Sequence, residues 1–157
     1  MGLLAMKSNS IVVALMSLVI TLTSLGCGES SIEAEEHFST GINLQGAGRL
    51  QSAIRQYDEA IRLDPQLAKA YNSRGVAYGL LGQYQRAIQD LDEAIRLEPL
   101  LGVAYANRSA AYTVLGKNED ASQDVERAVE LGVSRVQLET IIEGLKSQRN
   151  SGAKGGP

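Results

Sequence analysis

The feature that most constrains this chain is an eight-residue phrase that occurs twice. "DEAIRLDP" occupies residues 58–65 and "DEAIRLEP" occupies residues 92–99, an interval of 34 residues. The similarity extends beyond the phrase, because residues 70–99 align with both residues 36–65 and residues 104–133. A fixed period of this length indicates a stack of similar structural units. The sequence therefore predicts three units, at residues 34–67, 68–101 and 102–135.

Each unit is expected to form two helices joined by a short turn. In the middle unit, apolar and small residues recur at helical spacing on both sides of Gly82. Gly48 and Gly116 stand at the matching places of the other units. A glycine just past a helix end adopts the left-handed conformation that closes the helix. Pro65 and Pro99 then end the second helices of the first two units.

Small residues recur in the middle of the first helix of each unit, as Gly41, Gly75 and Ser109. A helical glycine costs roughly 1 kcal/mol relative to alanine, so its repetition indicates a close approach between two helices. No single unit can bury its apolar face, but a stack of three can.

These residues resemble the tetratricopeptide repeat family over residues 34–135. The first and third units depart from the family pattern, as terminal units of short arrays do. The resemblance implies an all-α, right-handed superhelical solenoid of helix-turn-helix repeats. The middle unit carries the pattern at Tyr71, Gly75, Tyr78, Gly82, Tyr84, Ala87, Leu91, Ala94 and Pro99.

The segment after the repeats is expected to close the stack. Residues 136–149 place four apolar side chains on one helical face, as the capping helix of the family does. Residues 150–157 are expected to form a disordered tail, and residues 27–33 a short linker before the first unit. The four apolar side chains are Leu138, Ile141, Ile142 and Leu145.

The N-terminal segment has the layout of a targeting sequence. Residues 1–26 carry one charge, at Lys7, followed by the apolar run 11–25. This run is shorter than the roughly 20 residues that a membrane-spanning helix needs. Cys27, the only cysteine, follows Gly26 as in a bacterial lipoprotein signal, which this segment resembles.

That resemblance implies a lipid on Cys27 and an exported protein associated with a membrane of the bacterial cell envelope. The alternative is an ordinary signal, or an uncleaved anchor, that contains a cysteine. N-myristoylation is not expected, because Met6 stands where that signal needs serine or threonine.

Composition excludes several classes of function. The net charge of −3 disfavours nucleic acid, which needs a basic face to neutralise phosphates. His37 is the only histidine, so neither a zinc site nor a nucleophile–base pair is expected. Residues 41–48 lack the lysine of a phosphate-binding loop. The sequence predicts no enzyme, no cofactor, no metal and no small-molecule substrate.

The carboxylates repeat with the unit and are interpreted as part of a solvated helix face. Asp58 precedes Arg62 by four residues, and Asp92 precedes Arg96 by the same interval. Weak surface pairs at this spacing are expected to explain both carboxylates.

The family binds extended or helical segments of partner proteins in a concave groove lined by its first helices. Asn72 and Asn107 are expected to hold the backbone amides of such a segment. By correspondence with the family, the groove would be lined by Phe38, Ile42, Gln45, Lys69, Asn72, Val76, Gly79, Leu80, Val103, Ala106, Asn107, Ala110 and Thr113.

One subgroup of the family grips a C-terminal carboxylate with a clamp of Lys, Asn and Arg. This clamp is not expected here, and only Asn107 fits it. Arg74 and Arg108 lie one place along from clamp positions and are expected to lay their stems over the neighbouring helix. The clamp positions that lack the required side chains are Phe38, Ile42, Ser73 and Val103.

The expected function is a non-catalytic protein-interaction module or assembly scaffold with a protein or peptide partner. The alternative is a structural or oligomerising repeat protein, in which the groove or one end packs against another copy.

Overall fold

The computed structural model describes residues 29–153, with side chains through residue 151, and it is entirely helical within that range. This confirms the all-α prediction. Each predicted unit contains two helices, and a seventh helix follows them. The helices are residues 29–46, α2 (Leu50–Leu63), α3 (Ala68–Leu80), α4 (Tyr84–Leu97), α5 (Gly102–Val114), α6 (Asn118–Glu130) and α7 (Arg135–Ala153).

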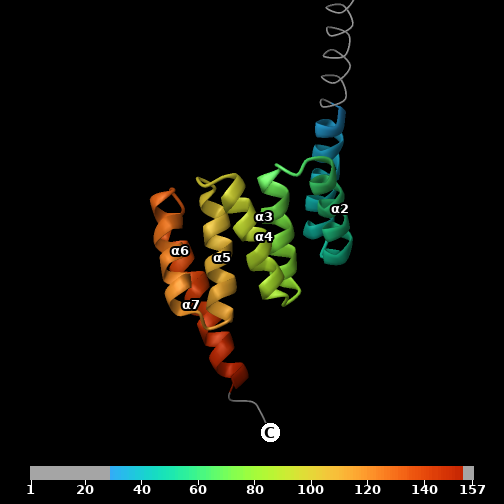
Figure 1. Cartoon of the computed structure of the whole chain (residues 1–157). Coiled ribbons are helices and arrows are strands. Elements are labelled where there is room, and N and C mark those ends of the chain that lie inside the picture. The colour runs from blue at the N-terminus through green and yellow to red at the C-terminus, as the bar shows by residue number, and fades with distance from the viewer. Residues whose placement is uncertain (1–28, 154–157) are drawn as a thin grey trace, which may run out of the picture.

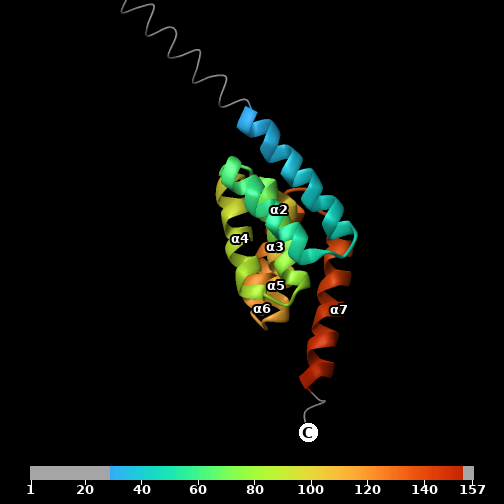
Figure 2. The ribbon, with the colours of Figure 1, turned by 90° about the vertical axis from the view of Figure 1, so that its right-hand side faces the viewer.

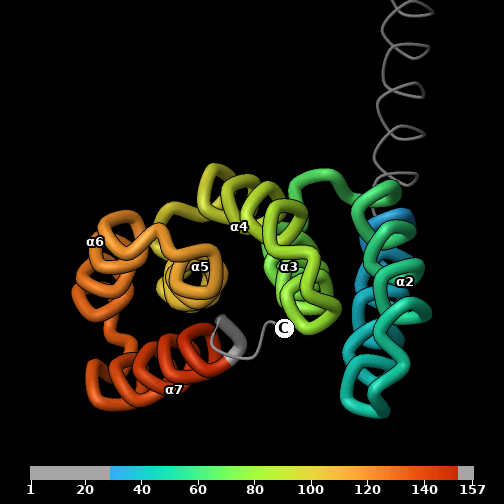
Figure 3. The backbone as a smooth tube through the Cα atoms, turned by 90° about the horizontal axis from the view of Figure 1, so that it is seen from below, coloured from blue at the N-terminus to red at the C-terminus, as the bar shows by residue number. Residues whose placement is uncertain are grey.

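The helices form two curved layers (Figure 1). Figure 3 shows helix 29–46, α3 and α5 along the inner side of the curve, with α2, α4 and α6 outside them. α7 packs against α5 and α6 and turns back along the inner side. Figure 2 shows that α7 also extends past the other helices at one end. The first helix of each unit therefore faces the inner surface, as the repeat pattern predicts.

The turn between the two helices of a unit has the same geometry each time. Gly48, Gly82 and Gly116 have φ angles of 72°, 74° and 77°, in the left-handed region that favours glycine. The residue that follows each glycine donates its backbone N–H to a carbonyl oxygen in the last turn of the preceding helix. Gln83 N, for example, donates to Tyr78 O at 2.9 Å. This closure confirms the predicted role of these glycines.

The core is built from small residues that face large ones. Tyr57 and Leu91 are 0% and 1% exposed. The backbone of Gly41 lies directly against the Tyr57 ring, and a Cβ on Gly75 would lie 3.0 Å from Leu91 Cγ. The repeated glycines are thus explained by close contact between the two helices of a unit.

Two predicted boundaries are wrong. Residues 29–33, predicted as linker, are already helical, because their Glu, Ser and Ile residues include no helix breaker. At the other end, α7 continues through Ala153, so residues 150–153 do not belong to a disordered tail. Residues 154–157 lie outside the described range.

The prediction of weak pairs within one helix is also wrong. Arg62 pairs with Glu59, and Arg96 pairs with Glu93, each at a spacing of three residues. Asp58 and Asp92 instead reach across to the next unit, because an arginine lies there within hydrogen-bonding distance.

Arg74 and Arg108 form this connection between units, and we call the two clusters the arginine bridges. Arg108 Nη1 lies 2.6 Å from Asp92 Oδ1 on α4, and its Nη2 lies 2.7 Å from Asp124 Oδ1 on α6. Arg74 makes the same pair of contacts to Asp58 and Asp90. We expected these arginines mainly to lay their stems over a neighbouring helix. Their main contacts are instead ion pairs with aspartates.

The inner carboxylate of each arginine bridge is buried. The side chains of Asp90 and Asp124 are 10% and 7% exposed. The hydrogen bond to Asp124 raises the pKa of Arg108 above its ordinary value, although burial opposes this shift. Arg108 therefore stays charged, and it supplies the counter-charge that a buried carboxylate needs when removed from water.

Within residues 29–153, none of the helices combines the length and apolar character needed to cross a membrane.

Replacing Arg108 by leucine is expected to destabilise the fold by about 2–4 kcal/mol, because Asp124 would remain buried without a counter-charge. The matched control is Arg96→Leu, which removes an exposed pair and should cost much less stability. Urea denaturation followed by circular dichroism measures both changes. Equal losses for the two variants would contradict the structural role of the arginine bridge.

Candidate functional site

The residues predicted to line a groove lie on helix 29–46, α3 and α5, the inner helices of the three units. Ile42, Leu80 and Val103 on these helices are large apolar side chains exposed by 42%, 63% and 48%. Lys69 is also exposed. The half-buried members are Phe38, Gln45, Asn72, Val76, Gly79, Ala106, Asn107 and Ala110.

Thr113 does not fit its predicted place. It is 0% exposed, and its hydroxyl donates to the carbonyl oxygen of Ser109 at 2.8 Å. The packing of α7 over the end of α5 covers it, so Thr113 is a core residue and cannot touch a partner.

A cleft of about 370 Å³ opens between α3, α5 and α7, and we call it the inner cleft. Five of the predicted groove residues line it, together with two side chains of α7. Its lining consists of Gly75, Val76, Gly79, Leu80, Tyr84, Ala87, Leu91, Asn107, Ala110, Ala111, Val114, Ile141 and Leu145.

Ile141 and Leu145 were predicted to cover the end of the stack rather than to line the groove. The side chains of Leu138 and Ile142 are buried, as predicted, at 4% and 8% exposure. The side chain of Ile141 is 54% exposed and lines the inner cleft. Ile141 and Ile142 are adjacent in sequence, so their side chains leave the helix about 100° apart and meet different neighbours. The spacing of the four apolar residues alone indicated a shared face but not its division between core and cleft.

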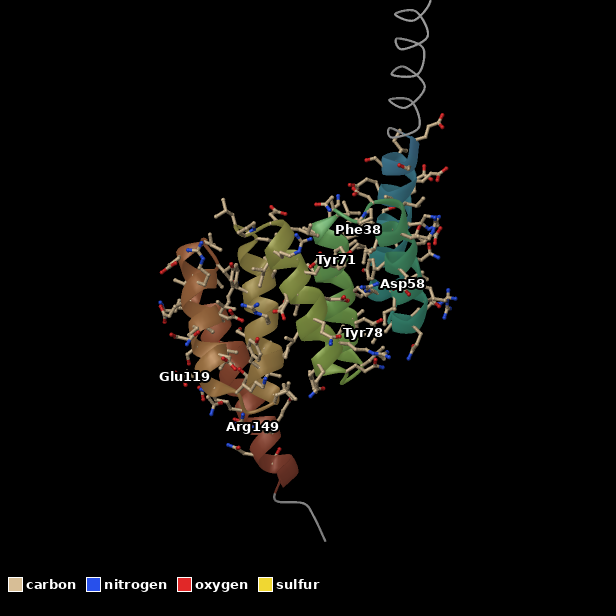
Figure 4. All side chains as sticks on the ribbon, viewed as in Figure 1. Phe38, Asp58, Tyr71, Tyr78, Glu119 and Arg149 are labelled. Carbon is tan, nitrogen blue, oxygen red and sulfur yellow. The ribbon has the colours of Figure 1, made fainter. Side chains whose placement is uncertain are left out.

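The contact that fixes this end of α7 is made by Arg149. Its Nη1 donates to the carbonyl oxygen of Thr113 at 2.6 Å, in the last turn of α5. Carbonyls in the last turn have no partner within their own helix, so a cation there is favourable. Figure 4 shows Arg149 at that end of α5. The α7 side of the inner cleft is therefore tied to α5.

The N-terminal part of the inner face carries one cation, and that cation already has partners. Lys69 Nζ lies 2.6 Å from Glu35 Oε2 and 4.8 Å above the centre of the Phe38 ring. Both interactions join helix 29–46 to α3. The Lys69 ammonium is thus neutralised before any partner arrives.

A pair of asparagines crosses the inner face between α3 and α5. Asn107 Nδ2 donates to Asn72 Oδ1 at 2.9 Å. A carboxamide has two donors and two acceptors, so the amide group of Asn72 and the oxygen of Asn107 retain bonding capacity. This arrangement is compatible with the predicted binding of a backbone amide.

Gln45 has a structural contact that the sequence did not reveal. The Tyr57 hydroxyl donates to Gln45 Oε1 at 2.9 Å, which links α2 to helix 29–46. Burial raises the pKa of Tyr57 to about 12, with a smaller opposing effect from Ser73. The Tyr57 hydroxyl therefore remains a donor at neutral pH.

A second cleft, of about 210 Å³, lies between α5, α6 and α7. Its charged groups pair with one another: Arg135 with Glu126 and Glu139, and Lys146 with Glu143. No group of His, Cys, Asp and Glu in residues 29–151 is arranged to hold a metal ion. The two hydroxyls that line the second cleft, those of Thr113 and Ser122, donate to backbone oxygens of their own helices.

Comparisons with known proteins agree with this architecture. A family model described as "TPR repeat" matches residues 47–82, and a model described as "Tetratricopeptide repeat" matches residues 68–99. A comparison with curated proteins finds no match.

Three solved structures are similar over most of their length. The first TPR of Spaghetti (RPAP3), bound to the HSP90 peptide SRMEEVD, is 26% identical with a TM-score of 0.69, covering 75% of this chain and 94% of that one. The second TPR of Spaghetti, bound to the same peptide, is 30% identical with a TM-score of 0.64, covering 66% and 95%. The Arabidopsis OM64 TPR domain is 24% identical, with a TM-score of 0.70 and coverage of 76% and 98%, and shows the fold alone.

Replacing Arg149 by alanine is expected to loosen the C-terminal half of α7, because the contact with Thr113 O is lost. Amide hydrogen exchange of residues 143–151 should become faster, while exchange in α3 and α4 stays unchanged. Lys146→Ala removes a neighbouring exposed pair and serves as the control, with little expected change. Unchanged exchange in the Arg149 variant would show that apolar packing alone holds this half of α7.

Proposed function

Because the chain belongs to the tetratricopeptide repeat family, we propose that it is a non-catalytic protein-interaction module or assembly scaffold. A segment of a partner protein would bind on the inner face formed by helix 29–46, α3 and α5. The observation that carries this proposal is the exposure of large apolar side chains on that face, at Ile42, Leu80 and Val103. Two similar TPR structures hold a peptide, which supports the same use here.

A non-catalytic role is supported by the state of the polar groups in the described residues. The charged side chains around the two clefts pair with each other or with the backbone. A binding surface needs no more than shape, apolar area and a few hydrogen bonds.

The partner is proposed to differ from the peptides seen in the similar structures. The HSP90 peptide SRMEEVD ends in acidic residues. In this chain Phe38, Ile42 and Val103 occupy positions where a carboxylate clamp needs polar or basic side chains. Lys69, a cation on the same face, is paired with Glu35.

We also propose that the protein acts at the bacterial cell envelope, held there by a lipid on Cys27. The support is the sequence of residues 1–27 alone, and Cys27 lies outside the described residues. An uncleaved N-terminal anchor would place the repeats at the same membrane.

A self-associating scaffold remains the alternative, in which another copy covers the inner face. Its support is the same exposed apolar face, because such faces also occur in oligomer interfaces. Sedimentation separates the two proposals, since a tight dimer that buries the inner face would leave no surface free for a peptide.

A photo-crosslinking amino acid placed at Leu80 is expected to give discrete adducts with a partner in intact cells. The same amino acid at Gln89, which is exposed on the outer helix α4, should give few adducts and is the matched control. Gel mobility and mass spectrometry identify the products. Equal adduct patterns at the two positions would contradict binding on the inner face.

The lipid proposal predicts that cells fed radioactive palmitate label the unaltered protein but not Cys27→Ala. The variant should also lose its retention in the membrane fraction, because about 0.8 kcal/mol is lost for each CH₂ group no longer buried in lipid. Equal retention of both proteins without label would point to the uncleaved anchor instead.

A further inference from the structure

Gly79 lies in the last turn of α3, and packing does not require a glycine there. A glycine loses more conformational freedom on folding than alanine does. Its backbone has no positive φ, and a Cβ built on it would meet only the Cβ of Ala87, at the ordinary contact distance of 4.0 Å. Packing and backbone geometry would therefore both accept alanine here.

Two other helical glycines, Gly41 and Gly75, are required by their surroundings, whereas a Cβ on Gly46 or Gly144 would meet nothing within 4 Å. A Cβ on Gly41 would overlap the Tyr57 ring, and one on Gly75 would lie 3.1 Å from the backbone oxygen of Ala87. Gly75 and Gly79 both line the inner cleft, but only Gly79 leaves room there for a Cβ. The space that its missing side chain leaves is part of that cleft.

The inner cleft is apolar on all three sides. Val76 and Leu80 come from α3, and Ala110 and Val114 come from α5. Ile141 and Leu145 close the third side from α7. The polar side chains at the cleft are Tyr84 and Asn107, and the lining includes no charged residue.

Two cations outside this lining already have partners. Lys69 pairs with Glu35, and Arg149 donates to the carbonyl oxygen of Thr113. A carboxylate that entered the inner cleft would lose water without gaining a cation, which is strongly unfavourable. A neutral apolar group carries no charge that needs water, and it gains free energy by burying its surface there.

The asparagine pair indicates that the apolar group belongs to a peptide. Asn107 lines the inner cleft and also holds Asn72, so carboxamide donors and acceptors lie directly beside the apolar space. A peptide main chain offers complementary N–H and C=O groups to such a pair. A fatty acid would match the apolar space but would bring a carboxylate for which the cleft has no cation.

We propose that the inner cleft is a pocket for a large apolar side chain of a partner's peptide segment, kept open by Gly79 and completed by α7. The asparagine pair holds the main chain of that segment beside the pocket. Recognition depends on the apolar side chain and not on a C-terminal carboxylate. This inference rests on the proposed function and names the chemistry of its partner.

The test selects short random peptides, displayed on phage, for binding to the full chain. The selected peptides should share a large apolar side chain and should bind equally well with a free or an amidated C-terminus. Their affinity is then measured by fluorescence anisotropy on three proteins: the unaltered chain, Gly79→Leu and Gly46→Leu. Gly46 is the matched control, because a Cβ there meets nothing within 4 Å and its helix does not line the inner cleft.

Gly79→Leu should weaken peptide binding by about tenfold or more, because its side chain fills the space that the peptide needs. Gly46→Leu should leave the affinity within about twofold. Thermal denaturation distinguishes a filled pocket from an unfolded protein. Both variants should melt at or above the temperature of the unaltered chain, because each replaces a helical glycine.

Three results would overturn the inference while leaving the proposed function intact. Selected peptides could end in acidic residues and lose binding on amidation, which would mean carboxylate recognition. Gly79→Leu could bind peptides as tightly as the unaltered chain, which would place binding elsewhere. Sedimentation could show a dimer that Gly79→Leu separates, while peptides still bind both proteins, which would make a second copy the occupant of the cleft. Selection of no peptide at all would reject the proposed function as well.

Discussion

The structure depends on the close contact between the two helices of each unit. Gly41 lies against the Tyr57 ring in the first unit, and Gly75 lies against Leu91 in the second. In the third unit Ser109 takes this place, fully buried, with its hydroxyl donating to the backbone oxygen of Ala106. Any side chain at Gly41 or Gly75, or one larger than serine at position 109, would press the two helices apart. It would also misalign the later units, since each unit packs only on its neighbours.

Charge provides the second connection between units, and it differs in kind from the first. The arginine bridges join an outer helix of one unit to both helices of the next through Arg74 and Arg108. Because Asp90 and Asp124 are nearly buried, breaking a bridge would leave a carboxylate without its counter-charge, which is strongly destabilising. Contact between apolar surfaces resists separation but tolerates sliding, whereas paired charges fix one register. The inner face is thereby held in a defined curve, which a binding surface requires.

The sequence predicted the framework well and the site in part. The positions of Gly48, Gly82 and Gly116 fixed the turns, because backbone conformation at a helix end depends on the residue itself. Of the groove residues predicted on α3 and α5, five line the inner cleft: Val76, Gly79, Leu80, Asn107 and Ala110. The prediction failed for Thr113 and Ile141, where α7 covers the first and turns the second toward the cleft. It failed again for Asp58 and Asp92, whose partners lie 16 residues further along the chain in the next unit.

By itself, the sequence determined the period, the two helices of each unit, the turns and the small residues between helices, because all of these are local or repeat with the unit. Tertiary structure decided how α7 lies, which carboxylate each arginine meets, and that Gly79 opens into an apolar space. Those outcomes depend on contacts between segments that do not share the repeat. A side chain's neighbour across a stack is set by the curve of the whole array, and no spacing along one helix contains that information.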